Sequence, residues 1–308
     1  MTPFFSVVIP VYNRAHLLGD TLKSVLAQTE QDFEIVVVDD GSNDDPETVV
    51  KAFADPRIVF LRQENGGGGK ARNTGIDAAK GLFIAFLDSD DQFLPHHLAA
   101  MRALLEGTSD TGAYARFIVD RGNGRTIFKP HRAVRDDEDM AMYLLCDRGF
   151  IATSVIVVPA DLARTIRFNE NLPAAEDTDF LIRAALAGTK FKMAETPSLY
   201  WRDFYDPNRL SIGRRCASMK DWIDTLRGRI PEKAYYGCLG WAYAKYVAMD
   251  RPGAAFGLWL AAVVRGCYRP SVAMIVFLQI FLGDKGYRHL ADTAIGWLGP
   301  LWNRKAKS

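Results

Sequence analysis

Short apolar runs alternate with helix-patterned segments through the first third of the chain, and this alternation restricts the fold more than any other feature. The β-rich runs, each bounded by turns, are residues 5–11, 33–40, 58–63 and 82–88. Helices are predicted between them at residues 15–28, 45–55 and 73–80. Strands that alternate with helices predict an α/β fold, with a mostly parallel central sheet and helices on both faces.

The pattern changes after about residue 110. Short strands are predicted at 114–120 and 153–159, and a helix at 177–187. From about residue 212 the pattern is mainly helical. We therefore divide the chain into residues 1–110, 111–211 and 212–308.

Composition excludes several classes of protein. The chain has 308 residues, is 48% hydrophobic and carries a net charge of +1, so it lacks the basic excess typical of nucleic-acid binders. Its four cysteines are far apart and form no CxxC pair, as expected of reduced thiols in the cytoplasm. The N-terminal residues do not resemble a signal peptide, and no apolar run is long enough to span a bilayer.

Acidic residues stand where predicted strands end. Asp39, Asp40 and Asp88 lie at such ends, which is where α/β sheets bind their ligands. Asp88 and Asp90 form a D-x-D pair whose oxygens suit Mg²⁺ or Mn²⁺ bridged to a nucleotide diphosphate. The alternatives are a solvated acidic loop at 88–91 and a solvated turn at Asp39.

A glycine-rich segment and an acidic helix start complete the set of motifs. In residues 64–75 (ENGGGGKARNTG), four glycines allow close approach of a ligand, and Lys70 and Arg72 add charge suited to a diphosphate. The segment fits neither a P-loop nor a dinucleotide fingerprint, and the alternative is a surface loop. Glu176 and Asp177 begin a helix with an apolar face, where capping and the helix dipole alone also favour acids.

In this order the motifs resemble a family 2 glycosyltransferase with the GT-A fold, which is Rossmann-like. The segments that carry the resemblance are SVVIPVYNRAH, VVVDDGS, ENGGGGKARNTG, LFIAFLDSDD and AAEDTDFLIRAALAG. The resemblance implies an inverting, hexosyltransferase-like enzyme. It would move a sugar from a nucleoside diphosphate, UDP above all, to a hydroxyl of a saccharide or lipid-linked glycan in cell-surface polysaccharide synthesis. Residues 1–110 would bind the nucleotide sugar and residues 111–211 the acceptor.

Site residues follow from the same resemblance. The nucleotide would be bound by Pro10, Tyr12, Arg14, Asp39, Lys70, Arg72 and Asp88. The divalent cation, Mn²⁺ or Mg²⁺, would be held by Asp90, with Asp88 as a second candidate ligand. Asp177 would be the catalytic base, and Glu176 would help to hold the acceptor.

The sequence departs from the family pattern in three places. The D-x-D motif is DSDD here, so Asp91 either shares the metal or points elsewhere. The Gln-x-x-Arg-Trp motif of processive members is absent, which implies a non-processive enzyme. The segment YWRDFYDPNRLS matches only loosely, and a diphosphate role for Arg202 or Arg209 is a hypothesis.

The C-terminal region contains two apolar runs, 254–264 and 271–282. They either pack against the catalytic domain or a partner subunit, as in a homo-oligomer, or form an interfacial surface. An interfacial surface would place the protein on the cytoplasmic face of the inner membrane rather than free in the cytoplasm. Its candidate head-group contacts are Arg265, Arg269, Lys285, Arg288, Trp297, Trp302, Arg304, Lys305 and Lys307.

Two other functions fit parts of this pattern. A nucleotidyltransferase also uses a nucleotide and a metal, but it would usually carry a glycine-rich basic loop after the first strand, where this chain has IPVYNRAH. A non-catalytic nucleotide-sugar-binding scaffold would keep Asp39 but could lose Asp90 or Asp177, and both are present. His96 and His97 are adjacent, do not share a helix face, and are expected to be ordinary helix-start residues.

Overall fold

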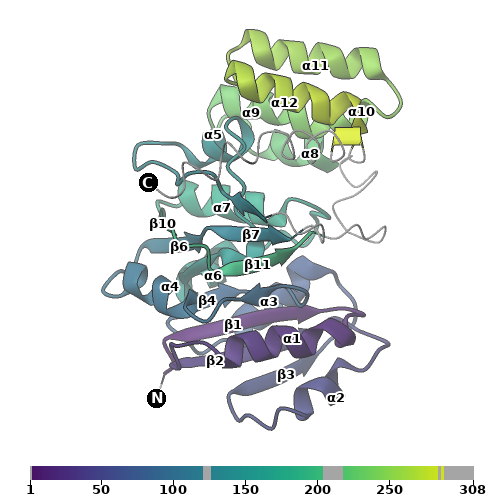
Figure 1. Cartoon of the computed structure of the whole chain (residues 1–308). Coiled ribbons are helices and arrows are strands. Elements are labelled where there is room, and N and C mark those ends of the chain that lie inside the picture. Colours follow the sequence, from purple (N-terminus) through teal and green to yellow (C-terminus); the bar gives the residue numbers. More distant parts are fainter. Residues whose placement is uncertain (1, 121–125, 204–217, 284–285, 288–308) are drawn as a thin grey trace. The chain divides into compact units, whose positions relative to one another are not determined.

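The computed structural model describes residues 2–120, 126–203, 218–283, 286 and 287 (Figure 1). The chain forms two compact units. Unit 1 comprises residues 1–144 and 149–212, and unit 2 comprises residues 145–148 and 213–308.

Unit 1 is built around a seven-stranded sheet in the order β10-β6-β9-β4-β1-β2-β3. Its strands are β1 (Phe5–Val11), β2 (Phe33–Asp39), β3 (Ile58–Arg62), β4 (Phe83–Phe86), β6 (Thr111–Ala115), β9 (Val157–Pro159) and β10 (Lys190–Ala194). Only β9 runs antiparallel to its neighbours; every other neighbouring pair is parallel. The predicted α/β fold with a mostly parallel sheet is therefore confirmed.

Helices cover both faces of this sheet, which explains why its central strands are buried and mostly apolar. Packed side by side along one face are α3 (Gly68–Ala78), α6 (Ala160–Ile166) and α7 (Glu176–Leu186), while α1 (Ala15–Leu26) lies on the opposite face (Figure 1). Every residue of β2 is buried, and so is every residue of β1 except Pro10. The remaining helices of unit 1 are α2 (Pro46–Lys51), α4 (His97–Leu105) and α5 (Met140–Leu145), whose last residue belongs to unit 2.

Parallel register places the strand ends in one row. Val11 pairs with Asp39, and Asp39 pairs with Arg62. The residues that follow β4 reach the same edge, because Leu87 donates its N–H to Val8 O and Asp88 comes next. The sheet therefore collects Tyr12, Asp39 and Asp88 at its carboxyl edge.

A second, four-stranded sheet in the order β5-β11-β7-β8 lies within unit 1. Its strands are β5 (Gln92–Phe93), β11 (Leu199–Arg202), β7 (Phe117–Asp120) and β8 (Thr126–Lys129). Because β5 directly follows the acidic residues 88–91, this sheet anchors the far end of the acidic turn.

Three predicted elements differ from the structure. The strand predicted at 114–120 is two strands, β6 and β7, because the chain changes sheets at Arg116. Within 153–159, the first three residues form a 3₁₀ turn and only Val157–Pro159 is a strand. Helix α3 begins at Gly68 rather than at Asn73. The predicted start was too late because glycine has a low helix propensity, and α3 begins with two glycines.

His97 is the first residue of α4, and His96 is its N-cap. The His97 ring is fully buried, stacks on Phe93 at 3.9 Å between centroids, and places Nδ1 2.8 Å from Ser198 Oγ. Burial lowers the pKa of His97 to about 3, so the ring is neutral and serves packing.

Unit 2 is helical in its described part. It contains α8 (Ser218–Thr225), α9 (Glu232–Cys238), a π-helical turn (Leu239–Tyr243), α10 (Ala244–Val247), α11 (Pro252–Val264) and α12 (Pro270–Phe281). Among the described helices, none combines the length and the apolarity that crossing a bilayer requires. Several predicted contacts lie outside the described residues, namely Arg209, Lys285, Arg288, Trp297, Trp302, Arg304, Lys305 and Lys307.

Close packing of α3 on β1 depends on one glycine. A Cβ on Gly75 would lie 2.3 Å from Val8 Cγ1 and 3.4 Å from Val38 Cγ2. Val8 is fully buried and β-branched, so it has no room to move aside. This contact fixes the height of α3, and therefore of Arg72, above the sheet.

We expect Gly75→Ala to destabilise unit 1 by about 1–3 kcal/mol, because an added methyl group overpacks the interface of α3 with the sheet. Chemical denaturation followed by circular dichroism measures this change. Gly19→Ala is the matched control, since its Cβ would meet Val49 at an ordinary 3.7 Å and alanine favours a helix interior by up to about 1 kcal/mol. Equal effects of the two substitutions would contradict the packing argument.

Candidate active site

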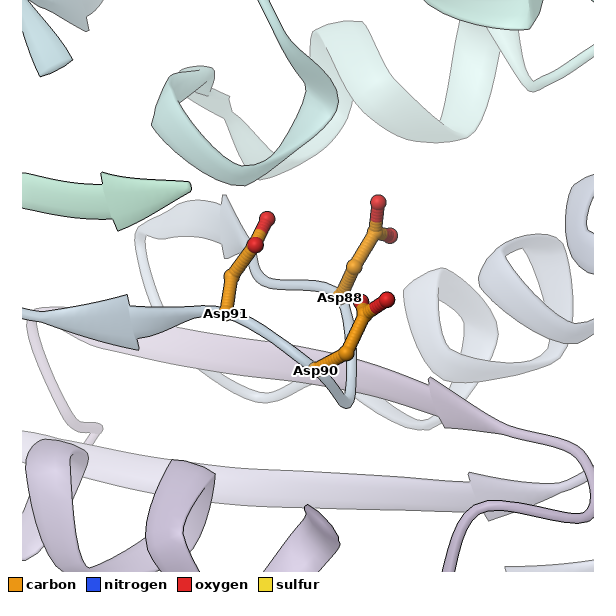
Figure 2. A group of neighbouring side chains, drawn as sticks. All are labelled: Asp88, Asp90 and Asp91. Carbon is orange, nitrogen blue, oxygen red and sulfur yellow. The ribbon is translucent and has the colours of Figure 1, made fainter. Parts of the chain in front are cut away.

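Three carboxylates gather at the turn after β4. One oxygen from each of Asp88, Asp90 and Asp91 lies within 4.8 Å of the others, and Figure 2 shows the three side chains extending to the same side of the turn. The turn is held by Asp91 N–H, which donates to Asp88 O (3.1 Å), and by Asp88 N–H, which donates to Ser154 Oγ (3.1 Å). An all-oxygen donor set of this size suits a hard divalent cation.

Asp91 does not belong to a solvated turn, so that alternative is wrong for this residue. Its exposure is 1%, the lowest of the three acids, and Ser154 Oγ donates to its Oδ2 at 2.5 Å. The N–H of Arg202 donates to Oδ1 at 3.2 Å, so β11 contributes directly to the site. Burial, followed by the charges of Asp90 and Asp88, raises the pKa of the Asp91 carboxyl well above its ordinary value.

Two arginines supply countercharge to the other acids. Arg14, directly before α1, places Nη1 2.6 Å from Asp90 Oδ2. Arg72, on α3, donates from Nη2 to Asp88 Oδ1 at 2.7 Å. Both arginines were predicted from the sequence to contact the nucleotide, and the structure places them against the predicted metal ligands.

Arg72 also reaches the helix that bears the predicted base. Its Nη1 donates to Glu176 Oε2 at 2.6 Å, and its guanidinium lies 5.3 Å from the centre of the Phe168 ring. Burial opposes the charge on Arg72, but Asp88 and Glu176 outweigh it and raise the pKa of the guanidinium. One side chain thus joins the acidic turn to the start of α7.

The start of α7 is unusual. Ala175 occupies the cap position with φ 62°, in the left-handed region, and offers no side-chain oxygen to the helix. Asp177 Oδ1 instead accepts the N–H of its neighbour Thr178 at 2.7 Å. The Asp177 carboxyl is partly buried, and this burial raises its pKa to about 6; nearby Glu176 acts in the same direction, while Arg72 opposes it.

The other predicted nucleotide contacts lie along the ends of β1 and β2. Tyr12 directly follows β1 and is 47% exposed, and Pro10 is the partly exposed residue of that strand. Asp39 is fully buried, and its Oδ1 accepts the Ser42 N–H at 2.8 Å. Arg62 Nη1 lies 3.1 Å from Oδ2, yet none of the described groups aims a hydrogen bond at that oxygen. Asp39 Oδ2 is thus a buried acceptor enclosed by protein, which a ligand N–H or hydroxyl would reach only after a neighbouring side chain moves.

Lys70 and Arg72, predicted together, face different environments. Lys70 is exposed, whereas Arg72 is buried in the contacts described above. The glycine segment is not a loose surface loop, because Gly68 and Gly69 form the first turn of α3. The N–H groups of Gly66 and Gly67 donate to the two oxygens of Asp40, at 2.9 and 2.8 Å.

Two further residues organise the site and were not assigned roles from the sequence. Asp40 anchors the glycine segment, and the second acid of the VVVDDGS motif is the only hint of that role. Asn73 donates to Phe168 O at 3.0 Å and to Glu170 Oε1 at 2.7 Å, and accepts the Phe168 N–H at 2.8 Å. It ties α3 to the segment that leads into α7, a partner that sequence spacing does not reveal.

Arg202 lies beside the cluster, with its backbone N–H on Asp91 and its Nη2 3.7 Å from Asp20 Oδ2. A diphosphate role for this side chain stays a prediction. Overall, unit 1 brings Arg14, Arg72, Asp88, Asp90, Glu176 and Asp177 into one chain of contacts, with Asp39 and Tyr12 farther along the same sheet edge.

Comparisons with known proteins identify the family of this chain. The model of the family "Glycosyl transferase family 2" matches residues 6–167, more than half of the chain, so the chain belongs to this family and is a glycosyltransferase. The amylovoran biosynthesis glycosyltransferase AmsB of Erwinia amylovora is 29% identical over 75% of this chain and 80% of its own length. An uncharacterised glycosyltransferase of Methanocaldococcus jannaschii is 31% identical over 67% of this chain and 72% of its own.

Solved structures show the fold. S. aureus TarS (residues 1–349) in complex with UDP-GlcNAc superposes with a TM-score of 0.62, at 21% identity over 90% of this chain and 81% of that chain. A mannosyltransferase of Pyrobaculum calidifontis in complex with GDP-Man and Mn²⁺ gives a TM-score of 0.57, at 17% identity over 94% of this chain and 83% of that chain. Unit 1 thus has the GT-A fold that the sequence predicted.

The raised pKa of Asp177 predicts a pH-dependent cost to stability. Folded Asp177 takes up its proton near pH 6 and the unfolded chain near pH 4, so its contribution becomes unfavourable as pH rises from about 4 to 6. We expect Asp177→Asn to stabilise the protein by about 2–3 kcal/mol at pH 8 and by almost nothing at pH 4. Thermal unfolding across this range measures the difference. Asp161→Asn, at a side chain 98% exposed, should show no such trend, and a trend equal to that of Asp177→Asn would contradict the assignment.

Proposed function

We propose that this glycosyltransferase transfers a sugar from a nucleoside diphosphate, UDP above all, to an acceptor hydroxyl with inversion at the anomeric carbon. The observation that carries the proposal is the position of Arg72, which contacts Asp88 on the predicted donor side and Glu176 beside the predicted base. Donor and base must lie on opposite sides of one reacting carbon for in-line attack. Because one Arg72 side chain contacts both Asp88 and Glu176, the predicted donor residues and the predicted base lie close enough to act on the same carbon.

The donor would lie along the carboxyl edge of the sheet. Asp39, once a neighbouring side chain moves from its buried Oδ2, would contact the nucleobase, with Pro10 and Tyr12 beside it, and Asp88 at the same sheet edge would contact the ribose. Lys70 and the start of α3 would face the diphosphate. UDP is supported by TarS, whose structure contains UDP-GlcNAc, whereas the mannosyltransferase of similar fold was solved with GDP-Man.

The acidic cluster fits a divalent cation, Mn²⁺ or Mg²⁺, since it presents three carboxyl groups within reach of one ion. Arg14 supplies the positive charge at Asp90 in the place that the ion would take. Asp90, with Asp88, would hold such an ion, which supplies Lewis-acid stabilisation of the charge on the leaving diphosphate. When the ion takes its place at Asp90, the Arg14 guanidinium would pair with the diphosphate instead, because the diphosphate is also an anion. Asp91, fixed by Ser154 and β11, would keep the turn in place.

Asp177 would act as the base that removes the acceptor proton. A carboxyl with pKa about 6 is mostly ionised at neutral pH, yet is a better proton acceptor than an ordinary aspartate. Glu176, neutralised by Arg72, would help to position the acceptor rather than compete for its proton. Residues 1–110 would accordingly bind the donor, and residues 111–211 would supply the acceptor side.

The acceptor would be a saccharide or lipid-linked glycan of a cell-surface polysaccharide, as the name of the amylovoran relative suggests. Release of UDP that depends on the acceptor would support transfer. Release of pyrophosphate would instead indicate a nucleotidyltransferase, and binding without turnover would indicate a scaffold.

Asp177→Asn should lower kcat by about 10²–10⁴-fold, because asparagine cannot accept the proton, while the affinity for UDP-sugar with Mn²⁺ stays similar. Single-turnover transfer and isothermal titration calorimetry separate the two effects. In the wild type, kcat/KM should fall about tenfold for each pH unit below the Asp177 pKa of about 6. Transfer at the wild-type rate by Asp177→Asn would remove Asp177 from the mechanism.

Asp90→Ala should weaken Mn²⁺-dependent binding of UDP by about 100-fold, because the cation loses a carboxylate ligand. Binding measured with and without Mn²⁺ isolates the metal-dependent part. Asp137→Ala, which removes a carboxylate 91% exposed, is the control and should bind as the wild type does. Unchanged Mn²⁺ dependence in Asp90→Ala would reject its role as a ligand.

A further inference from the structure

Helices α11 and α12 have apolar outer faces. Neither Pro252–Val264 nor Pro270–Phe281 contains a charged residue. On α11, Phe256, Leu260 and Val264 follow one another at four-residue spacing and are 44%, 43% and 77% exposed. On α12, Met274 is 59% exposed. A helix at the surface of a soluble protein normally places polar side chains at such positions. These two helices instead expose apolar side chains to water, which is unfavourable unless a partner covers them.

A row of four aromatic rings joins the two helices. The ring centroids of Phe256 and Trp259 are 5.6 Å apart, those of Trp259 and Phe277 5.1 Å in an edge-on contact, and those of Phe277 and Phe281 4.7 Å. Trp259 also crosses to α12 through Nε1, which donates to Ala273 O at 3.0 Å. All four rings keep some exposure to solvent, so the apolar surface continues from one helix to the other.

The lengths of the helices exclude one way of covering this surface. With 13 and 12 residues, they extend about 20 and 18 Å, well short of a hydrocarbon core of about 30 Å. They can lie along a membrane surface but cannot cross it.

Charge separates strongly between the two parts of the sequence. Residues 213–308 contain 15 Lys or Arg and 6 Asp or Glu, and 15 minus 6 gives +9, although the whole chain carries only +1. Within the described part, Arg251, Arg265 and Arg269 stand at the ends of the two apolar helices. Asp147 partly neutralises Arg269, whereas Arg265 lies over the Tyr236 ring at 4.1 Å. An apolar face flanked by arginines in a basic region matches an anionic, apolar partner.

We propose that α11 and α12 lie on the surface of a membrane that contains anionic lipids, with the exposed apolar side chains among the acyl chains and the flanking arginines at the head groups. A second copy of the chain is a poorer partner, because an isologous contact would bring two strongly basic regions together. The inference does not depend on sugar transfer, since it rests on unit 2 alone.

Co-sedimentation of the full chain with vesicles tests the proposal. We expect binding to phosphatidylcholine vesicles that contain phosphatidylglycerol, weaker binding to phosphatidylcholine alone, and loss of part of the affinity at high salt. Absence of binding to the anionic vesicles at low salt would overturn it. The proposal would also be overturned if the protein formed a stable dimer and substitutions on the apolar face weakened dimerisation but left vesicle binding unchanged.

Substitutions locate the contact. The triple variant Leu260→Gln, Val264→Gln and Met274→Gln should weaken partitioning at least tenfold, and Arg251→Gln about fivefold. Glutamine suits a helix and all these positions are exposed, so the fold should persist, as circular dichroism can verify. Leu82→Gln, at an apolar side chain 56% exposed in unit 1, and Lys80→Gln are the matched controls. Equal losses in variants and controls would overturn the assignment to α11 and α12.

UDP-sugar binding measured without vesicles keeps the two proposals separate. The triple variant should bind the donor as the wild type does, and Asp90→Ala should bind vesicles as the wild type does. Loss of both properties in the triple variant would mean that its fold is damaged, and single substitutions at Val264 and Met274, each expected to weaken partitioning severalfold, then decide the matter.

Discussion

The candidate site depends on one buried guanidinium. Arg72 pairs with both Asp88 and Glu176, and without it these carboxylates would be left close to Asp90, Asp91 and Asp177 with too little positive charge. Removing one partner of a buried ion pair is typically costly, by about 3–5 kcal/mol, because the other charge stays desolvated. The two halves of unit 1 can therefore share a site only while Arg72 is held at the right height, and Gly75 sets that height by its contact with Val8.

Much of this arrangement could be predicted from the sequence because its causes are local. The apolar runs that became β1, β2 and β4 end in Val11, Asp39 and Leu87–Asp88, and the rule for parallel strands brings such ends to one edge. Asp177 was predicted to be the base from its place at the start of an apolar helix together with the family resemblance. Local sequence patterns do not show which distant residues will meet in the fold. The contacts of Arg72 with Glu176 and of Asn73 with Phe168 could therefore not be predicted.

The burial of individual side chains was also predicted wrongly from local sequence patterns. Asp91 directly follows Asp90 in the sequence, yet Ser154 and β11 enclose it while Asp90 stays partly open. Likewise, glycines 66–69 suggested a loop, since glycine usually interrupts helices. Here Asp40 holds the backbone of Gly66 and Gly67, and the next two glycines start α3 close to Glu170 and Glu176.

The bonds from α3 to the segment before α7 also bear on how the protein is made. Arg72 and Asn73 are separated from their partners by 95–104 residues, so they wait for those residues to leave the ribosome. At translation rates of about 5–20 residues per second, that interval lasts between about 5 and 20 s. During this time the nascent chain exposes the glycine-rich turn and the acidic turn without the helix that completes them. A fragment that ends before α7 would therefore contain every strand of the main sheet except β10, yet it would lack Glu176 and Asp177 and could not complete the candidate site.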